Sequence, residues 1–271
     1  MEKLTITVNE LPLSFVDTGG TGTPILFVHG NSGSSHDFHR QLGSDLARDY
    51  RLIAMDLPGH GDSGWAKLSQ YGIPFYAETM VTLARSLDAE AGVFVGWSLG
   101  GHAVLEAVPE LPAAKGFVIF GTPPLRCPPN IEEAFLPNPD FGAGMQAELD
   151  EGQASNYAAS FLGLDYDRSL AESFARQILR TDPAARAGLA SSAARPFVDE
   201  VLLLSSMTQP LAIFHGEQEK LVDIAYLRSL KAPTLWRNAV QVIEDAGHAI
   251  QVEQPARFND LLRAFLADIG A

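Results

Sequence analysis

The feature that most constrains the fold is a series of short strands that are apolar on both faces and alternate with helical segments. Strands of this kind are typical of a parallel sheet covered by helices on both sides. Two alternating segments precede them, residues 4–8 and 13–16, and a turn joins these segments into a hairpin. The sequence therefore predicts an α/β protein with a mostly parallel, twisted sheet. The predicted strands after the hairpin are residues 25–28, 52–55, 93–95, 117–120, 211–214 and 240–243.

The alternation of strands and helices is interrupted once, in the second half of the chain. There, strand-like runs disappear, and short amphipathic segments such as residues 170–179 are punctuated by proline and glycine. We expect a helical cap over residues 122–207, inserted into a core formed by residues 1–121 and 208–271. A last helix over residues 255–269 has apolar residues at helical spacing and should cover one face of the sheet.

Charge and cysteine content restrict the partners and the compartment. The chain has 33 acidic and 19 basic residues and a formal net charge of −14, which repels nucleic acid and anionic membrane surfaces. Its one cysteine, Cys127, cannot form an intrachain disulfide, and residues 1–10 do not resemble a signal peptide. No apolar run approaches the ~20 residues that span a bilayer. We expect a cytoplasmic protein with no nucleic-acid or membrane partner, and a monomer is favoured.

A glycine-rich stretch, Gly96-Trp97-Ser98-Leu99-Gly100-Gly101, follows the predicted strand at residues 93–95 and precedes a helix-compatible run at residues 102–108. In this context a G-x-S-x-G pattern indicates a sharp strand-to-helix turn that lifts the serine hydroxyl clear of the sheet. The N-terminus of the helix favours negative charge that develops there. The alternative is an ordinary glycine-rich turn, but both flanks fit the functional interpretation. We predict Ser98 as a nucleophile.

A serine hydroxyl is a weak nucleophile and needs a base within hydrogen-bond reach. His248 follows the last predicted strand, so in a parallel sheet it emerges at the carboxyl edge, where Ser98 also emerges. We therefore predict His248 as the base. Several other histidines are assigned structural or surface roles, namely His36, His39, His60, His102 and His215.

The base needs a carboxylate that orients it, and chain order places this acid between Ser98 and His248. The loop after the strand at residues 211–214 offers Glu217, Glu219 and Asp223. Glu219 is the best placed, because Asp223 is predicted to be the N-cap of the next helix and Glu217 a solvated loop residue. We predict Glu219 as the acid, with Asp223 as the second choice.

Acyl transfer also requires hydrogen-bond donors for the oxyanion. One donor is the backbone N–H after the nucleophile, and the second comes from a loop after an earlier strand. The loop His29-Gly30-Asn31-Ser32-Gly33 follows the strand at residues 25–28. We predict that the amides of Leu99 and Asn31 are the donors, with Gly30 permitting the close approach. A plain turn is the alternative for this loop.

Together these residues resemble the α/β-hydrolase superfamily over nearly the whole chain. The resemblance implies the α/β-hydrolase fold and the triad Ser98, His248 and Glu219, although most members carry aspartate where this chain has Glu219. Further matching segments are Asp56-Leu57-Pro58-Gly59-His60-Gly61-Asp62-Ser63 and Gly247-His248 with Glu253, Pro255 and Phe258 behind it.

Within the superfamily the chain looks like the metal-independent N-acyl-homoserine lactonases. The segments that carry this likeness are His29-Gly30-Asn31-Ser32, the stretch from Gly96 to His102, Gly121-Thr122-Pro123-Pro124, and Glu219. The resemblance implies opening of the homoserine lactone ring beneath the helical cap, through an acyl-enzyme intermediate and without a cofactor.

The resemblance also implies substrate contacts. The family's cap presents a tyrosine to the substrate, and Tyr157 matches that position best, with core packing as an equal alternative. Gly30 and Trp97, beside the nucleophile, are further candidates for substrate contact. Apolar cap residues suit an acyl tail held away from Ser98; these are Phe141, Met145, Phe161 and Leu162.

Other functions are considered beside this one. The nearest is a general carboxylesterase or lactonase with another small ester, and a cofactor-free oxygenase or peroxidase on the same fold stays open. A non-catalytic binding protein is disfavoured because the serine, histidine and carboxylate are all present. Aspartate-nucleophile hydrolases are disfavoured by serine at position 98. A zinc lactonase is rejected, because the one dense cluster, His36-Asp37-Phe38-His39, lacks further ligands nearby.

Overall fold

One eight-stranded sheet forms the centre of the computed structural model, which describes residues 2–192 and 194–271. The strand order is β1-β2-β4-β3-β5-β6-β7-β8. β1 and β2 form the expected antiparallel hairpin, β2 pairs antiparallel with β4, and the remaining pairs are parallel. The predicted α/β fold is thus confirmed. The strands are β1 (Leu4–Val8), β2 (Leu11–Asp17), β3 (Pro24–Val28), β4 (Arg51–Met55), β5 (Val93–Trp97), β6 (Gly116–Phe120), β7 (Leu211–Gly216) and β8 (Gln241–Ile243).

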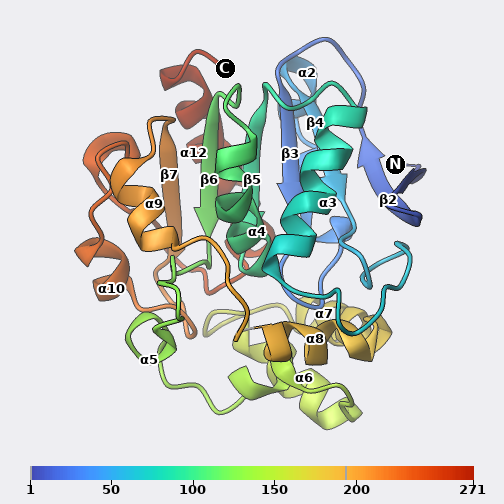
Figure 1. The fold of residues 1–271 in the computed structure, drawn as a ribbon. Coiled ribbons are helices and arrows are strands. Elements are labelled where there is room, and N and C mark those ends of the chain that lie inside the picture. The colour runs from blue at the N-terminus through green and yellow to red at the C-terminus, as the bar shows by residue number, and fades with distance from the viewer. Residues whose placement is uncertain (1, 193) are drawn as a thin grey trace.

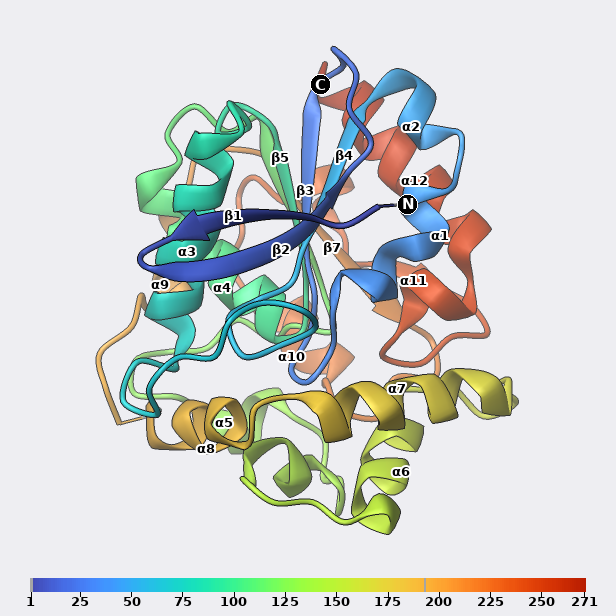
Figure 2. The ribbon, with the colours of Figure 1, turned by 90° about the vertical axis from the view of Figure 1, so that its right-hand side faces the viewer.

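Helices cover both faces of the sheet (Figure 2). The long helix α3 (Ile73–Ser86) and α4 (Leu99–Ala107) lie on one face. The other face carries α1 (His39–Leu42), α2 (Leu46–Asp49), α11 (Ile250–Glu253) and α12 (Pro255–Asp268). Every residue of β5 and β6 is buried, as the apolar runs predicted for strands covered on both sides. A short helix, α10 (Ile224–Ser229), follows β7. The 3₁₀ helices of the described chain are η1 (Ser35–Phe38), η2 (Val108–Glu110), η3 (Phe141–Met145) and η4 (Trp236–Asn238).

The segment between β6 and β7 is helical, as predicted. α5 (Ile131–Ala134), α6 (Glu151–Ser160), α7 (Arg168–Arg180) and α8 (Pro183–Ser192) lie beyond the carboxyl ends of the parallel strands in both ribbon views (Figures 1 and 2). We call these four the cap helices. α6 begins at a capping box, in which Asp150 and Gln153 each bond to the other's backbone amide.

One helix of this segment lies elsewhere than the sequence suggested. α9 (Glu200–Ser206) was expected within the cap insertion, but it packs beside α4 at the face of the sheet (Figure 1). The backbone amide of Val198, just before it, donates to the Glu106 side chain of α4 at 2.7 Å. The chain has therefore returned to the sheet layer before β7 begins.

None of the helices in the described ranges combines the length and the apolarity that crossing a membrane requires.

Candidate active site

Ser98 stands at a sharp turn between β5 and α4. Its backbone has φ 52° and ψ −118°, a strained conformation for a residue with a side chain. Its amide donates to the carbonyl oxygen of Phe120 on β6 at 2.9 Å. A Cβ at Gly100 would collide with the backbone of Val28, so only glycine permits this packing of the turn against β3. The turn thus holds the serine at the carboxyl edge of the sheet, as the motif predicted.

Glu219 and His248 form a buried pair at the same edge. Oε2 of Glu219 lies 2.8 Å from Nδ1 of His248, and each side chain is 2% exposed. Oε1 of Glu219 accepts the amides of Lys220 and Leu221 at 2.9 and 2.8 Å. Since a carboxylate accepts, Nδ1 carries the proton and Nε2 is left free to act as a base.

The surroundings of Glu219 favour its ionised form. Burial acts to raise the pKa of the carboxyl, but the neighbouring His248, its hydrogen bond and the amide of Leu221 outweigh burial and hold the pKa below its usual value. The carboxylate is therefore present at neutral pH to orient the imidazole. Asp223, the second choice for the acid, accepts the amide of Ala225 at 2.7 Å and caps α10, which confirms its predicted capping role.

His248 lies against the residues that surround the nucleophile. A Cβ built on Gly121 would come within 2.7 Å of the imidazole Cε1, so the ring rests directly on this glycine. Gly121 follows Phe120, whose carbonyl binds the Ser98 amide. Trp97, directly before Ser98, donates from Nε1 to the His248 carbonyl oxygen at 2.9 Å. The ends of β5, β6, β7 and β8 thus place Ser98 and the bonded pair of Glu219 and His248 at the same edge of the sheet.

The loop after β3 approaches Ser98 from the side. A Cβ on Gly30 would lie 3.1 Å from the Ser98 Cβ, which leaves little space for a side chain there. Buried His29 fixes this loop: Nδ1 donates to the Gly30 carbonyl at 2.7 Å, and Nε2 accepts the Leu57 amide at 2.9 Å. Burial lowers the pKa of His29 to about 4, which keeps the ring neutral, as this pair of bonds requires.

The two amides predicted as oxyanion donors are free. Within the described chain, neither the N–H of Asn31 nor that of Leu99 donates to another residue. Leu99 is the first residue of α4, so its amide is one of the unpaired donors of a helix N-terminus. The Asn31 side chain bonds to the cap segment, because its Nδ2 donates to the Gly144 carbonyl of η3 at 2.7 Å.

A cavity of about 330 Å³ opens beside Ser98. Ser98, Leu99 and Asn31 form its polar end, and residues from the cap segment and α8 form much of its apolar wall. Of the residues predicted for substrate contact, Phe141, Met145 and Tyr157 line it. Further apolar lining comes from Ile73, Leu125, Ile131, Phe135, Leu189 and Phe197.

The structure differs from the sequence prediction at Phe161, Leu162 and Trp97. None of them lines this cavity, and each is buried with 4% exposure or less. The Phe161 ring lies 5.8 Å from both the Trp97 ring and the His248 ring, measured between centroids. Trp97 and Phe161 instead pack against the ring of His248. Gly30 likewise does not line it.

Tyr157 combines the two roles that the sequence left open. It is 6% exposed and packs on Phe161 with centroids 4.7 Å apart, yet it also lines the cavity. Its hydroxyl and the Asn31 side chain both lie beside Gly144, and burial raises the pKa of the phenol, so it stays neutral.

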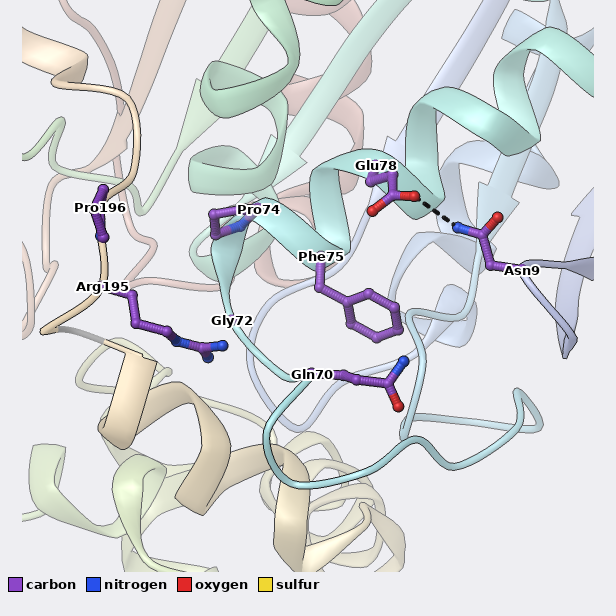
Figure 3. A pocket seen from close by; sticks show the side chains of 8 residues that line it. All are labelled: Asn9, Gln70, Gly72, Pro74, Phe75, Glu78, Arg195 and Pro196. Atoms are coloured by element: carbon purple, nitrogen blue, oxygen red, sulfur yellow. Dashed lines mark hydrogen bonds between the residues drawn. The ribbon is translucent and has the colours of Figure 1, made fainter.

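A larger hollow of about 630 Å³ adjoins this cavity at Pro74, which lines both (Figure 3). None of the predicted site residues lines it, and its polar contact is a 3.0 Å bond from Asn9 Nδ2 to Glu78 (Figure 3). Size therefore does not mark the functional cavity here. The lining residues are Asn9, Gln70, Gly72, Pro74, Phe75, Glu78, Arg195 and Pro196.

Two features of the site escaped sequence analysis. Glu253 accepts the amides of Gly163 and Gly247 at 2.7 and 2.8 Å, and so connects the end of α6 to the loop of His248. His102 lines the cavity, although it was assigned a structural role. Its position one helical turn after Ser98 was a signal that could have revealed this.

The cluster at residues 36–39 does not converge on one point. His36 and His39 are exposed and stacked, with ring centroids 4.7 Å apart, whereas Asp37 is buried and accepts a bond from Gln177. In the described ranges, no three or more histidine, cysteine or acidic side chains are grouped as metal ligands would be.

Comparisons with known proteins agree with this fold. A sequence profile of the alpha/beta hydrolase fold family matches residues 23–255. A non-heme haloperoxidase of Rhodococcus erythropolis is 29% identical over 237 residues, which are 83% of this chain and 85% of that protein. A 2-hydroxymuconate semialdehyde hydrolase of Pseudomonas sp. strain CF600 is 26% identical over 263 residues, covering 93% and 89% of the two chains.

Crystal structures of the N-acyl homoserine lactonase AidH resemble this chain over almost its entire length. For a mutant of AidH in complex with N-hexanoyl homoserine lactone, the TM-score is 0.92 at 29% identity, with 99% of this chain and 98% of that chain covered. For AidH in complex with N-butanoyl homoserine, the TM-score is again 0.92 at 29% identity, with coverage of 99% and 97%.

Proposed function

This chain belongs to the alpha/beta hydrolase fold family, and on that premise we propose that it opens the lactone ring of N-acyl-homoserine lactones. The observation that carries the proposal is the position of Ser98, which stands at a strained turn and faces an apolar cavity roofed by cap residues. The likeness to AidH, whose structures hold a lactone in one case and the ring-opened acid in another, supports the same substrate class.

The reaction would begin with attack on the ring carbonyl. Nε2 of His248 takes the proton of the Ser98 hydroxyl while Oγ bonds to the carbonyl carbon. The ring C–O bond then breaks, and the departing ring oxygen takes the proton from His248. The product is an ester between Ser98 and the carboxyl group of an acyl-homoserine, whose new hydroxyl stays on the same molecule.

Hydrolysis of this ester would complete the cycle. His248 takes a proton from a water molecule, and the resulting hydroxide attacks the ester carbonyl. The bond to Oγ breaks, and Ser98 recovers its proton from His248. One water is consumed in total, and the free acyl-homoserine leaves.

The chain's own groups would stabilise both charged stages. The imidazolium that forms twice faces the Glu219 carboxylate at 2.8 Å. The oxyanion would accept hydrogen bonds from the free backbone amides of Leu99 and Asn31. These amides are fixed in position before the reaction and need no rearrangement. We assign the neutral Tyr157 hydroxyl, beside the Asn31 side chain, to hold the polar amide of the substrate, so that the acyl tail extends along Phe141 and Met145.

A carboxylesterase acting on a different small ester is the second candidate. The observation in its favour is that the apolar wall of the cavity would take any acyl or alkyl group of suitable size. The same triad also serves other reactions within this fold, as the haloperoxidase and semialdehyde hydrolase among the relatives illustrate.

Product analysis separates these functions. The protein is incubated with a panel of acyl-homoserine lactones and linear esters, and the products are identified by mass spectrometry. We expect the ring-opened acyl-homoserine, one water heavier than the substrate, which closes again on acidification. Release of free homoserine lactone and a fatty acid would show an acylase. Turnover of linear esters alone would establish the carboxylesterase.

The nucleophile is tested on the same protein. Wild type should be labelled by a fluorophosphonate, and Ser98→Ala should not be labelled and should lose roughly four or more orders of magnitude in turnover. Ser86→Ala removes a hydroxyl that bonds to Thr82 on α3, far from the site, and serves as the matched control. An active Ser98→Ala protein, or no labelling of wild type, would refute the serine mechanism.

A further inference from the structure

A second histidine and carboxylate pair lies in the wall of the cavity. His102 is one turn along α4 from Ser98, and its amide bonds to the Ser98 carbonyl at 3.3 Å. Residues at this spacing lie on the same side of a helix. Accordingly, both side chains line the same cavity.

Glu200 fixes the orientation of the His102 ring. Nδ1 lies 2.9 and 3.0 Å from the two carboxylate oxygens of Glu200, which is fully buried at the start of α9. The same carboxylate accepts the Leu125 amide at 2.6 Å. Because a carboxylate only accepts, the proton sits on Nδ1, and Nε2 is directed away from Glu200.

Nε2 of His102 has no hydrogen-bond partner in the described chain. It is also not one of the fully buried polar atoms that lack a partner. Since His102 lines the cavity, this nitrogen is open to it. The neighbouring wall is apolar and includes Leu125, Ile131, Phe135 and Phe197. A hydrocarbon chain placed here would cover Nε2 without bonding to it, which is unfavourable, whereas an oxygen on the chain would pair with it.

We propose that His102, held by Glu200, selects acyl chains that carry a hydroxyl on the third carbon. The proposal rests on the lactone function proposed above. His102 lies four residues after Ser98, about 6 Å further along the helix axis. In an extended acyl-homoserine lactone the third chain carbon lies roughly 6 Å from the ring carbonyl, by ordinary covalent dimensions. A hydroxyl both donates and accepts, so it pairs with Nε2 in either protonation state.

In this arrangement Glu200 is a positioning residue and His102 the specificity-determining one. Neither takes part in the proton transfers at Ser98, so an unsubstituted chain gains nothing from the pair. The distinguishing measurement is therefore a ratio of two substrates in one enzyme, which a merely structural role would leave unchanged.

The experiment compares 3-hydroxyhexanoyl-homoserine lactone with hexanoyl-homoserine lactone. In wild type we expect kcat/KM to favour the hydroxylated chain by roughly tenfold, the effect of one net hydrogen bond. His102→Leu should abolish this preference, because it raises KM for the hydroxylated lactone and also removes the nitrogen that an unsubstituted chain would cover without a bond. Glu200→Gln should reduce the preference, and His102→Gln, which keeps a polar group, should restore part of it. His39→Leu, an exposed histidine, is the control.

The outcomes separate this inference from the proposed function. If wild type opens neither lactone, the proposed function is wrong and the inference fails with it. If wild type opens both with equal efficiency, or if His102→Leu keeps the preference, only the inference is wrong. Should His102→Leu fail to fold, the wild-type ratio and the Glu200→Gln and His102→Gln proteins decide the matter, since an unchanged preference in both variants contradicts it.

Discussion

The indole Nε1 of Trp97 donates a 2.9 Å hydrogen bond to the backbone oxygen of His248, 151 residues further along the chain. Trp97 precedes the candidate nucleophile, so this one bond connects the turn of Ser98 to the loop of the candidate base. Both groups are buried, and Trp97 is 1% exposed. The relative position of Ser98 and His248 therefore depends on a side chain that does not line the cavity.

Trp97→Phe should weaken this connection and keep most of the packing. The variant leaves a buried carbonyl without its donor, which should cost about 1–3 kcal/mol of folding stability, and it should lower kcat/KM roughly tenfold through a less precisely held base. Thermal unfolding and steady-state kinetics measure the two effects. Trp65→Phe, at a tryptophan that is 62% exposed, is the control. If Trp97→Phe behaved like Trp65→Phe, the bond would have no positional role.

Removing the two acidic candidates should produce opposite patterns. Glu219→Ala takes the orienting carboxylate from His248, so activity should fall by about three orders of magnitude or more. Asp223→Ala removes the cap of α10 instead, and should cost roughly 1 kcal/mol of stability while activity at a temperature well below unfolding stays within a few-fold of wild type. Kinetics and thermal unfolding of both proteins test this ranking, and the reverse result would assign the acid to Asp223.

Much of this site followed from the sequence because its parts are local patterns. Six apolar runs and two alternating segments located the eight strands of the described sheet, and the glycines around Ser98 predicted a sharp turn, whose φ is positive. Chain order then restricted the acid to one loop, where Glu219 is the residue that meets His248. The strands and the turn needed only residues close together in sequence, whereas the acid and the base also needed the order of the chain and the rule that parallel strands end at one edge.

The remaining features depend on contacts between distant segments. The sequence identified Phe161 as an apolar residue of the cap, but apolarity does not reveal whether its side chain meets a ligand or the ring of His248. The partner of His102, Glu200, lies 98 residues away, and the position of α9 beside α4 was not encoded in any local pattern. These are tertiary choices, and propensity and periodicity do not determine them.

A buried carboxyl group under the cap should make stability depend on pH. Asp37 is 2% exposed and accepts bonds from Gln177 of α7 and from the Ser34 amide, at 2.8 and 3.0 Å. Burial raises its pKa to about 7 despite these bonds, whereas in the unfolded chain it is near the ordinary value of 3.8. The folded state thus holds the proton more tightly than the unfolded chain does. The contribution of Asp37 to the free energy of unfolding is therefore fully present below about pH 4 and is lost as pH rises through about 7.

Asp37→Asn should remove this loss of stability with rising pH, because the amide does not ionise. The unfolding temperature of the variant should gain several degrees relative to wild type between pH 4 and pH 8, on the order expected for a domain of this size. Asp165→Asn, at an exposed aspartate, supplies the control. If the difference in unfolding temperature between wild type and Asp37→Asn stayed constant across this pH range, Asp37 would be ionised throughout.

The length of the acyl chain should control turnover until the cavity is filled. Each methylene buried against the apolar wall contributes ~0.8 kcal/mol, which corresponds to roughly a fourfold rise in kcat/KM. The cavity of about 330 Å³ is finite, so the rise should stop at a definite length. Phe141 pairs with Phe135 at 4.8 Å between ring centroids and closes part of the wall. Phe141→Ala should therefore move the stopping point to longer chains.

The control for this prediction is a phenylalanine of the other hollow. Phe75→Ala removes the same side chain from the hollow of Figure 3, where no acyl chain is expected, and should leave the chain-length profile unchanged. Initial rates with a series of straight-chain acyl-homoserine lactones give both profiles. A profile that is flat in wild type would mean that the tail remains in solvent. A shift produced by Phe75→Ala instead of Phe141→Ala would place the tail in the larger hollow, since only a residue in contact with the chain end can change where the rise stops.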